Sequence, residues 1–287
     1  MSENDSLKPE SWLWHLLGLI NPIIVMASNL VGGYWVASGV IYMLGLGPIL
    51  DMLFGRAEKP KPARASGRPF EALLYIHAFI QFATLGTLLY RASIDGSAWT
   101  TWVAALSTGI SSGVSGIIVA HEMGHTKHRS FSWWVGRANL LSVLYLHFTT
   151  EHNFTHHKHV STVKDPATAR YGESLWWFIA RTVPGQFRDA AAVHTRKGRM
   201  GLKNPVYRGL LLQIVMVAAM FAFLGPWITG AFLAQAAFAV FLLEYINYIR
   251  HYGLLREVGE RQTEMHSWQS EERWSRWTLL ELTRHPA

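Results

Sequence analysis

The sequence predicts an all-α, polytopic membrane protein with six transmembrane helices that pair as three hairpins. Half of the 287 residues are hydrophobic and the mean hydropathy is +0.13, which is too apolar for an ordinary soluble domain. Six apolar segments approach the roughly 20 residues that are needed to cross a hydrocarbon core of about 30 Å. Short turns with glycine, proline and small polar residues separate the members of each pair. We therefore expect residues 1–287 to form a single membrane domain.

The predicted spans follow one another along the chain in three pairs. They cover residues 12–31, 34–54, 70–90, 99–120, 207–227 and 229–249, with turns at 32–33, 93–97 and 225–226. Residues 131–148 are also apolar, but a seventh crossing would separate two histidine-rich segments, 121–125 and 151–157, that must meet at one site. We therefore expect 131–148 to form a buried or re-entrant helix on the side of the histidines.

The distribution of basic residues predicts the orientation of these spans. Of the 26 lysines and arginines, only Arg91 falls in a predicted far-side loop, and all the others fall in near-side segments. The positive-inside rule then places both termini and every histidine-rich segment in the cytoplasm. The first ten residues are polar and not basic, and no small-residue cleavage site follows, so we expect the first span to be retained.

Composition excludes several classes of function. The chain has no cysteine, which rules out disulfides, thiolate-ligated zinc or haem, and an iron–sulfur centre of its own. Any redox chemistry would need an external electron donor. The net charge of +7 does not indicate nucleic acid, because the basic residues flank apolar spans and form no stripe interleaved with aromatic residues.

Two histidine boxes indicate a metal centre. His121 and His125 are four residues apart where the fourth span ends, so they share one helical face. His152, His156 and His157 repeat this spacing, and the adjacent pair could serve two metals from one turn. Five imidazoles exceed the ligands that one tetrahedral zinc accepts. The sequence therefore predicts two metal ions.

The sixth span carries a polar face that could point at the same site. Offsets of three and seven residues put Glu244, Asn247 and His251 on one side of the helix. An ionisable residue inside a span is costly and is usually functional or paired. We interpret His251 as a ligand and Glu244 as a carboxylate that orients a ligand imidazole. A structural ion pair between Glu244 and an arginine is the alternative.

The remaining histidines fit ordinary roles better than metal binding. His15 and His77 lie in or near spans and are expected to form hydrogen bonds within the bundle. The histidines in basic stretches are expected to be solvated, namely His128, His159 and His194. His147 could support the metal site from behind a ligand.

Several motifs in order resemble those of the membrane-bound, non-haem di-iron alkane 1-monooxygenases, within the fatty acid desaturase-like superfamily. They are HEMGH, EHNFTHHKHV followed by KDPATARYGES, NYIRHYGLLR, and HSWQSEERWSRW followed by LTRH, with LGPILDMLFG and RTVPGQF matching between them. The resemblance covers nearly the whole chain.

The resemblance implies two non-haem iron ions and a set of ligands. The iron ligands fall on His121, His125, His152, His156, His157, His251 and His285. Candidates for supporting residues around the ligands are Glu122, Glu151, Glu244 and Asn247. The family's last box continues with a further pair of histidines, whereas this chain reads Arg284-His285-Pro286-Ala287. We therefore expect a domain that is truncated at its C-terminal histidine box.

The resemblance also implies an activity and its partners. The reaction is the insertion of one oxygen atom from O2 into the terminal C–H bond of a medium-chain alkane, which reaches the site from membrane lipid. Rubredoxin and an NADH-dependent rubredoxin reductase supply the electrons, and the membrane is the bacterial inner (plasma) membrane. Met43, in the second span, is the candidate residue of the substrate channel, with a packing role as the alternative.

Three other functions remain possible from the residues. A fatty-acyl desaturase or hydroxylase, or a xylene-type monooxygenase, shares the histidine boxes. A membrane zinc protease would use the HExxH pattern of HEMGH with Glu122 as general base, but it would leave the other box histidines unexplained. A bis-histidine haem or metal-transport protein would place paired histidines deep in facing spans, whereas these cluster at the membrane edge.

Overall fold

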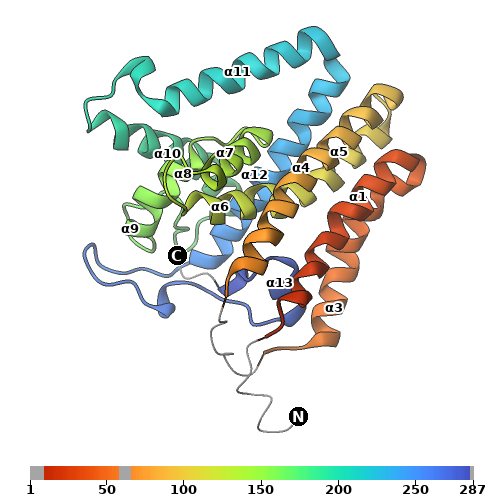
Figure 1. Ribbon diagram of the computed structural model, residues 1–287. Coiled ribbons are helices and arrows are strands. Elements are labelled where there is room, and N and C mark those ends of the chain that lie inside the picture. Colours follow the sequence, from red (N-terminus) through yellow and green to blue (C-terminus); the bar gives the residue numbers. More distant parts are fainter. Residues whose placement is uncertain (1–9, 58–65, 285–287) are drawn as a thin grey trace.

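A computed structural model describes residues 10–57 and 66–284 of the chain. The described residues form helices and connecting loops without a β-strand, apart from one isolated bridge between Arg56 and Glu272. Long helices lie side by side in a tilted bundle, and shorter helices gather at one end of it (Figure 1). The predicted all-α class is confirmed.

Six helical stretches are long and apolar enough to span a membrane, as predicted. They are Trp12–Val31, Gly33–Phe54, Arg68–Asp95, Trp99–Gly124, Pro205–Leu224 and Pro226–His251. The first two consist of η2 (Trp12–Leu19) and α1 (Ile20–Val31), then η3 (Gly33–Ala37), α2 (Ser38–Val40), η4 (Ile41–Leu46) and α3 (Gly47–Phe54). The others are α4 (Arg68–Asp95); α5 (Trp99–Ser111), η5 (Ser112–Ile118) and α6 (Val119–Gly124); α11 (Pro205–Leu224); and α12 (Pro226–His251).

Two predicted turns are displaced by a few residues. Helix α4 continues to Asp95, so the second reversal starts at Gly96, whose φ is 56°. The third reversal is confined to Gly225, with a φ of 85°, and Pro226 already begins α12, so Trp227 belongs to the sixth span rather than the fifth. Proline is favoured in the first turn of a helix because the missing N–H has no partner there. The prediction of three hairpins is confirmed.

Small residues let α5 approach α12 closely. A Cβ atom at Gly109 would lie 2.9 Å from the carbonyl oxygen of Gln235, so no larger residue fits there without movement. Close backbone approach is typical of helix pairs in membranes, where lipid gives no hydrophobic drive for association.

A buried polar network holds the same helices in register. The amide of Gln81 on α4 donates to Ser112 over 2.9 Å, and the Ser112 hydroxyl donates to Gln235 over 2.8 Å. The amide of Gln235 donates in turn to the carbonyl of Ser142 over 2.9 Å. Each of these side chains has at least one partner, as an apolar interior requires, although Oε1 of Gln81 has none among the described residues.

Arg91, which was counted as a loop residue, lies within α4 and caps α1. Its guanidinium donates to the carbonyls of Asn29 over 2.7 Å and Leu30 over 2.8 Å, and pairs with Asp95 over 3.0 Å. These carbonyls belong to the last turn of α1, where backbone acceptors lack helical partners. Arg91, which the sequence places on the far side, therefore has a structural role.

We expect Arg91→Met to lower the stability of the protein by about 2–4 kcal/mol, because it removes charge-assisted hydrogen bonds to one buried and one partly buried carbonyl and leaves Asp95 without its cation. Thermal unfolding in detergent, followed by circular dichroism, measures the effect. Arg188→Met, at an exposed arginine of the same chain, is the matched control. An equal shift in both variants would contradict the capping role.

The segment 131–148 is not a span, as predicted, but its helix ends at Ser142 and the residues that follow form a turn. Helix α7 (Phe131–Ser142) ends in a turn at Leu144, whose φ is 56°, and α8 (Phe148–Glu151) follows. The other short elements at this end are η6 (His152–His156), α9 (His157–His159), α10 (Leu175–Thr195), η7 (Gly201–Lys203), η8 (Glu264–His266), α13 (Arg273–Thr278) and η9 (Leu282–Arg284).

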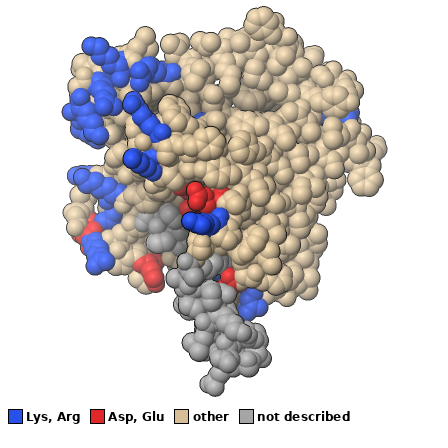
Figure 2. Space-filling view, in the orientation of Figure 1, with Lys and Arg blue, Asp and Glu red and all other residues tan. Residues whose placement is uncertain are grey.

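Basic side chains gather at the end of the bundle that carries these short helices. In Figure 2, lysines and arginines lie along the left of the face shown, where α9, α10 and the start of α11 lie in Figure 1. The rest of this face is mostly uncharged. Such an asymmetry is typical of a membrane protein whose basic end faces the cytoplasm.

The C-terminal segment docks against the first span through a buried ion network. Arg276 pairs with Glu281 over 3.0 Å and with Glu10 over 2.8 Å, and the His15 ring bonds to Glu281 over 3.0 Å. Trp14 and Trp277 stack beside this network, with ring centroids 4.7 Å apart. The network holds Arg276 and Glu281, which precede η9 in the chain, against the first span.

This network predicts a loss of stability in acid. Burial alone would raise the pKa of Glu281, but hydrogen bonds from His15 and Arg276 lower it to about 2, below the ordinary value of 4.5. A group whose folded pKa is depressed stabilises the fold above its unfolded pKa, so the stabilisation is present above pH 4.5 and is lost as pH falls toward 2. With allowance for the partial exposure of Glu281, we expect a loss on the order of 2 kcal/mol. Thermal unfolding between pH 7 and 3 measures it, and Glu281→Gln should flatten the decline; an unchanged decline would contradict this assignment.

Candidate metal centre

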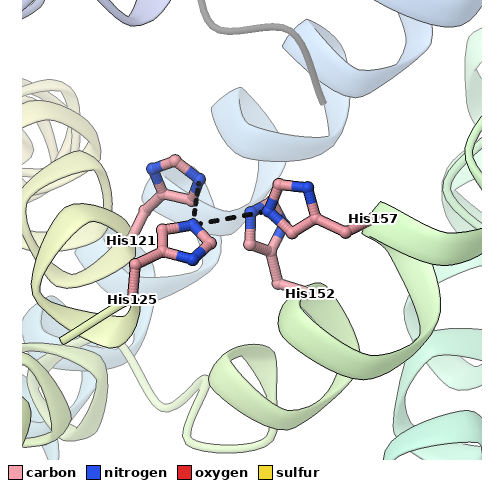
Figure 3. Close-up of side chains that lie close together, drawn as sticks. All are labelled: His121, His125, His152 and His157. Atoms are coloured by element: carbon pink, nitrogen blue, oxygen red, sulfur yellow. Dashed lines mark hydrogen bonds between the residues drawn. The ribbon is translucent and has the colours of Figure 1, made fainter. Parts of the chain in front are cut away.

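Four of the predicted histidines converge through their ring nitrogens. His121 and His125 come from the end of the fourth span, and His152 and His157 come from η6 and the start of α9 (Figure 3). The Nε2 atoms of His121 and His125 are 3.3 Å apart, and those of His125 and His157 are 3.4 Å apart. One nitrogen from each of the four rings lies within 4.8 Å of the others. We call these residues the four-histidine group.

A π-helical turn selects His157 as the partner of His152. The backbone N–H of His157 donates to the carbonyl of His152, which is the i→i+5 bond of a π-helix. His157 therefore lies over His152, whereas an ordinary α-helix would place His156 there. His156 points to a second set of side chains instead.

The second set contains two carboxylates. Glu151, His156 and Asp165 offer ligand atoms within 4.8 Å of one another, and all three are buried. We call them the carboxylate group. The ring of His251, from the end of α12, lies beside them with its centroid 5.3 Å from that of His156. The Nδ1 atom of His251 lies 3.3 Å from the carbonyl of His266, which leaves Nε2 for the site.

Asp165 is the site residue that the sequence analysis missed. Its Oδ2 atom lies 2.9 Å from Nδ1 of His156, and it also accepts a hydrogen bond from Thr168 over 2.7 Å. Burial alone would raise the pKa of Asp165, but the His156 ring beside it lowers that pKa. A carboxylate on the outer nitrogen fixes the tautomer of a ligand imidazole and its orientation. The only sequence signal was the KDPATARYGES motif, in which Asp165 had no assigned role.

The donor atoms of both groups fit metal ions. Two nitrogens bound to one ion at about 2.1 Å, with bond angles near 100°, lie about 3.2 Å apart, which matches the spacing of the Nε2 atoms. Burial, with neighbouring histidines as a further cause, lowers the pKa of His157 to about 4 and that of His152 well below its ordinary value. Neutral imidazoles are the form that binds metal.

Glu151 also fits a cation. Its Oε1 atom is buried and has no hydrogen-bond partner among the described residues. Burial, together with the carboxylates of Asp165 and Glu244, raises the pKa of Glu151 well above its ordinary value. A buried carboxylate in this state is stabilised by a proton or by a metal ion.

A small cavity of about 50 Å³ lies between the two groups. Its polar wall includes His121, His152, His156 and His251. Aliphatic and aromatic side chains complete it, namely Ile117, Ile118, Phe148, Leu243, Ile246 and Leu282. An apolar group that enters this cavity would therefore meet the ligand histidines directly.

The supporting residues predicted from sequence have different outcomes. Glu122 contacts the ring of His121, with 3.1 Å between Oε1 and Nδ1. Glu244 is fully buried, but it accepts hydrogen bonds from Tyr145, Gln186 and Asn247. These hydrogen bonds go to none of the candidate ligand imidazoles, so the role of Glu244 in orienting one stays a prediction. The alternative, an ion pair with an arginine, is not found among the described residues.

Two predicted site residues stay outside the described site. Met43 lies half-buried on the π-helical segment η4 and lines neither this cavity nor the larger one beside α11. His285 lies outside the described residues. Asn247 lines the small cavity, as the shared face with His251 predicts.

The other histidines largely follow the predictions. His77 bonds to Ser115 within the bundle over 2.9 Å, whereas His15 bonds to the C-terminal segment. His128 is exposed, but His159 and His194 are half-buried rather than solvated. His147 is buried against Tyr145 and Phe187 and belongs to neither ligand group.

Six apolar helices and histidine clusters at the end of the fourth span define an integral membrane protein with a histidine-rich metal centre. The sequence model of the fatty acid desaturase family matches residues 97–287. Alkane 1-monooxygenase 1 of Alcanivorax borkumensis is 34% identical over 97% of this chain and 73% of its own length. The Pseudomonas aeruginosa protein of the same name is 35% identical over 96% of this chain and 77% of its own length. The chain belongs to the alkane 1-monooxygenase family of oxidoreductases.

A more distant relative connects the family to related chemistry. The xylene/toluene monooxygenase hydroxylase component of Pseudomonas putida is 26% identical over 85% of this chain and 69% of its own length. Neither a zinc protease nor a haem or metal-transport protein is consistent with membership of this oxidoreductase family.

Proposed function

We propose that this protein hydroxylates the terminal methyl group of medium-chain alkanes with O2 at a di-iron centre. The observation that carries the proposal is the small cavity, in which ligand histidines and apolar side chains share one wall. An alkane has no polar group to bind, so only an apolar pocket beside the metals can position its methyl group. The names of the relatives support the same substrate class.

The two iron ions would be held by different donor sets. The four-histidine group would hold one ion through His121, His125, His152 and His157. His156 and His251 would hold the other, with His285 as a further ligand and Glu151 within reach. Iron bound here would supply the activation of O2, since histidine-rich sites without thiolates suit such iron. Glu122 and Asp165 hold the rings of His121 and His156 in place.

The reaction needs electrons that the chain cannot store. One alkane and one O2, with two electrons and two protons, give one primary alcohol and one water. Because the chain has no cysteine and hence no iron–sulfur centre, we propose rubredoxin and an NADH-dependent rubredoxin reductase as donors. They would reach the basic end of the bundle from the cytoplasm, with the protein in the bacterial inner membrane.

Met43 remains our candidate for the path of the substrate through the bundle. Its π-helical segment interrupts the second span, and such interruptions occur often at functional sites. Met43 is half-buried, so part of its side chain is accessible.

Turnover of octane tests the proposal. The purified protein in nanodiscs is supplied with rubredoxin, its reductase and NADH, and products are separated by gas chromatography. We expect 1-octanol with one oxygen atom from labelled O2. Octene would indicate a desaturase, and oxidation of xylene without oxidation of octane would indicate the xylene-type reaction; either result would overturn the proposal.

A further inference from the structure

A second cavity, much larger than the first, lies beside α11 and carries a strongly basic wall. Its volume is about 920 Å³, and it lies between α7, the end of α6 and the segment from α10 to α11. Five lysines and arginines line it, and no aspartate or glutamate does. They are Arg129, Arg137, Lys197, Arg199 and Arg208. We call it the basic cavity.

These cations are not neutralised within the part of the chain that the structure describes. None of the five forms a salt bridge with a described carboxylate. Arg137 donates one hydrogen bond, to the carbonyl of Leu146 over 2.9 Å, and lies over the ring of Trp133. Lys197 lies over the ring of Phe154. Four of the five are exposed, so water screens their repulsion, but like charges gathered around one cavity attract an anion.

His194 lies beside these cations and within the same positive field. Burial, followed by the positive charges of Arg199, Lys197 and Arg137, lowers the pKa of His194, which also lines the cavity. The Nδ1 atom of His194 is buried and has no hydrogen-bond partner among the described residues. The cavity therefore offers a concentration of positive charge to a ligand.

The other wall of the cavity is apolar and continues along a span. Trp133, Trp134, Leu141, Leu146 and Leu212 line it. The cavity lies where the fourth span ends at Gly124 and the fifth begins at Pro205, which places it at the boundary of the membrane. Helix α11 is the least buried of the six spans, so its aliphatic side chains are open to lipid.

We propose that the basic cavity binds the phosphate headgroup of an anionic membrane lipid. Arginine and lysine match a phosphate diester in charge and in hydrogen-bond donors. The acyl chains would lie against the tryptophan and leucine wall and along the exposed face of α11. A basic pocket between helices at the cytoplasmic end of a membrane protein is the geometry that recognises such headgroups. The basic cavity adjoins the four-histidine group, because His125 lines it, but no other ligand candidate does.

Native mass spectrometry of the delipidated, detergent-solubilised protein tests this inference. Phosphatidylglycerol and phosphatidylcholine with identical acyl chains are titrated separately. We expect phosphatidylglycerol to bind at least about tenfold more tightly, as several nearby cations predict. The variant Lys197→Gln/Arg199→Gln/Arg208→Gln should lose this preference while retaining its helix content and its metal.

A matched control removes three basic residues that lie outside the cavity. Arg188, Arg196 and Lys203 are exposed, belong to the same basic end and do not line the cavity. Their joint replacement by glutamine should leave the preference unchanged. If both triple variants lose the preference equally, the preference depends on the overall positive charge and not on the cavity, which would overturn the proposal.

Three further outcomes would also overturn it. Equal binding of the two lipids would show that the basic residues do not select an anionic headgroup. Complete displacement of the lipid by millimolar inorganic phosphate would show a site for a free anion. Unchanged lipid binding by the first triple variant, together with slower reduction by an electron-donor protein, would assign the basic wall to protein docking.

Discussion

At the proposed di-iron centre, His156→Ala and His157→Ala should each remove one of the two iron ions, and the ion removed should differ between them. The reason is that two adjacent histidines serve different groups: His157 belongs to the four-histidine group and His156 to the carboxylate group. Losing a residue that only supports a ligand can reduce activity by up to about 100-fold. Because these variants lose a ligand itself, turnover should fall further in both. Iron analysis of the purified protein gives the number of ions that remain.

X-ray absorption identifies which ion remains. After His156→Ala, the remaining iron should have nitrogen ligands from the four-histidine group. After His157→Ala, the remaining iron should include oxygen from the carboxylate group or from water. His159→Ala is the matched control, because His159 lies two residues further along and belongs to neither group. Identical spectra for the two variants would contradict the division into two groups.

Asp165→Asn should weaken the second iron site without unfolding the protein. The substitution keeps the size of the side chain but removes the charge that faces Nδ1 of His156. An amide can present its N–H to the ring, which favours the wrong tautomer and leaves the metal-facing nitrogen protonated. We expect iron affinity at this site to fall about 10–100-fold. Competition with a chelator measures this affinity, and turnover should fall in parallel.

Two comparisons separate positioning from packing. Asp165→Glu keeps the charge, so it should restore part of the affinity. Thr168→Val removes a hydrogen bond to Asp165 but no charge, so it should have a smaller effect. If Asp165→Asn binds iron as the natural protein does, then Asp165 does not position His156.

The sequence by itself determined the class of fold. The length and apolarity of six segments are enough to identify them as membrane spans. In lipid, a helix must form all its backbone hydrogen bonds internally and expose apolar side chains. These are properties of the local sequence, so the spans appear within a few residues of where they were expected. Arg91 shows the limit: its position in sequence indicated a loop, but the carbonyls that it caps belong to another helix.

The candidate site was predicted only in part, for the same physical reason. The spacing of His121 and His125 on one helix requires only local geometry, and the structure brings them together. The histidines of the second box were also identified, but their division between two groups depends on a π-helical turn. An i→i+5 bond differs from an i→i+4 bond by one residue of register, and tertiary packing decides between them.

Only the tertiary structure decided which partner each buried polar group has. Asp165 reaches His156 across a loop, and Glu244 is held by Tyr145 and Gln186 from two other segments. The basic cavity likewise combines residues from α7, α10 and α11 that share no motif. A buried charge must find a partner wherever the fold brings one within reach. The sequence therefore determined the membrane class and the ligand type, and the packing of distant segments decided how the ligands are divided and supported.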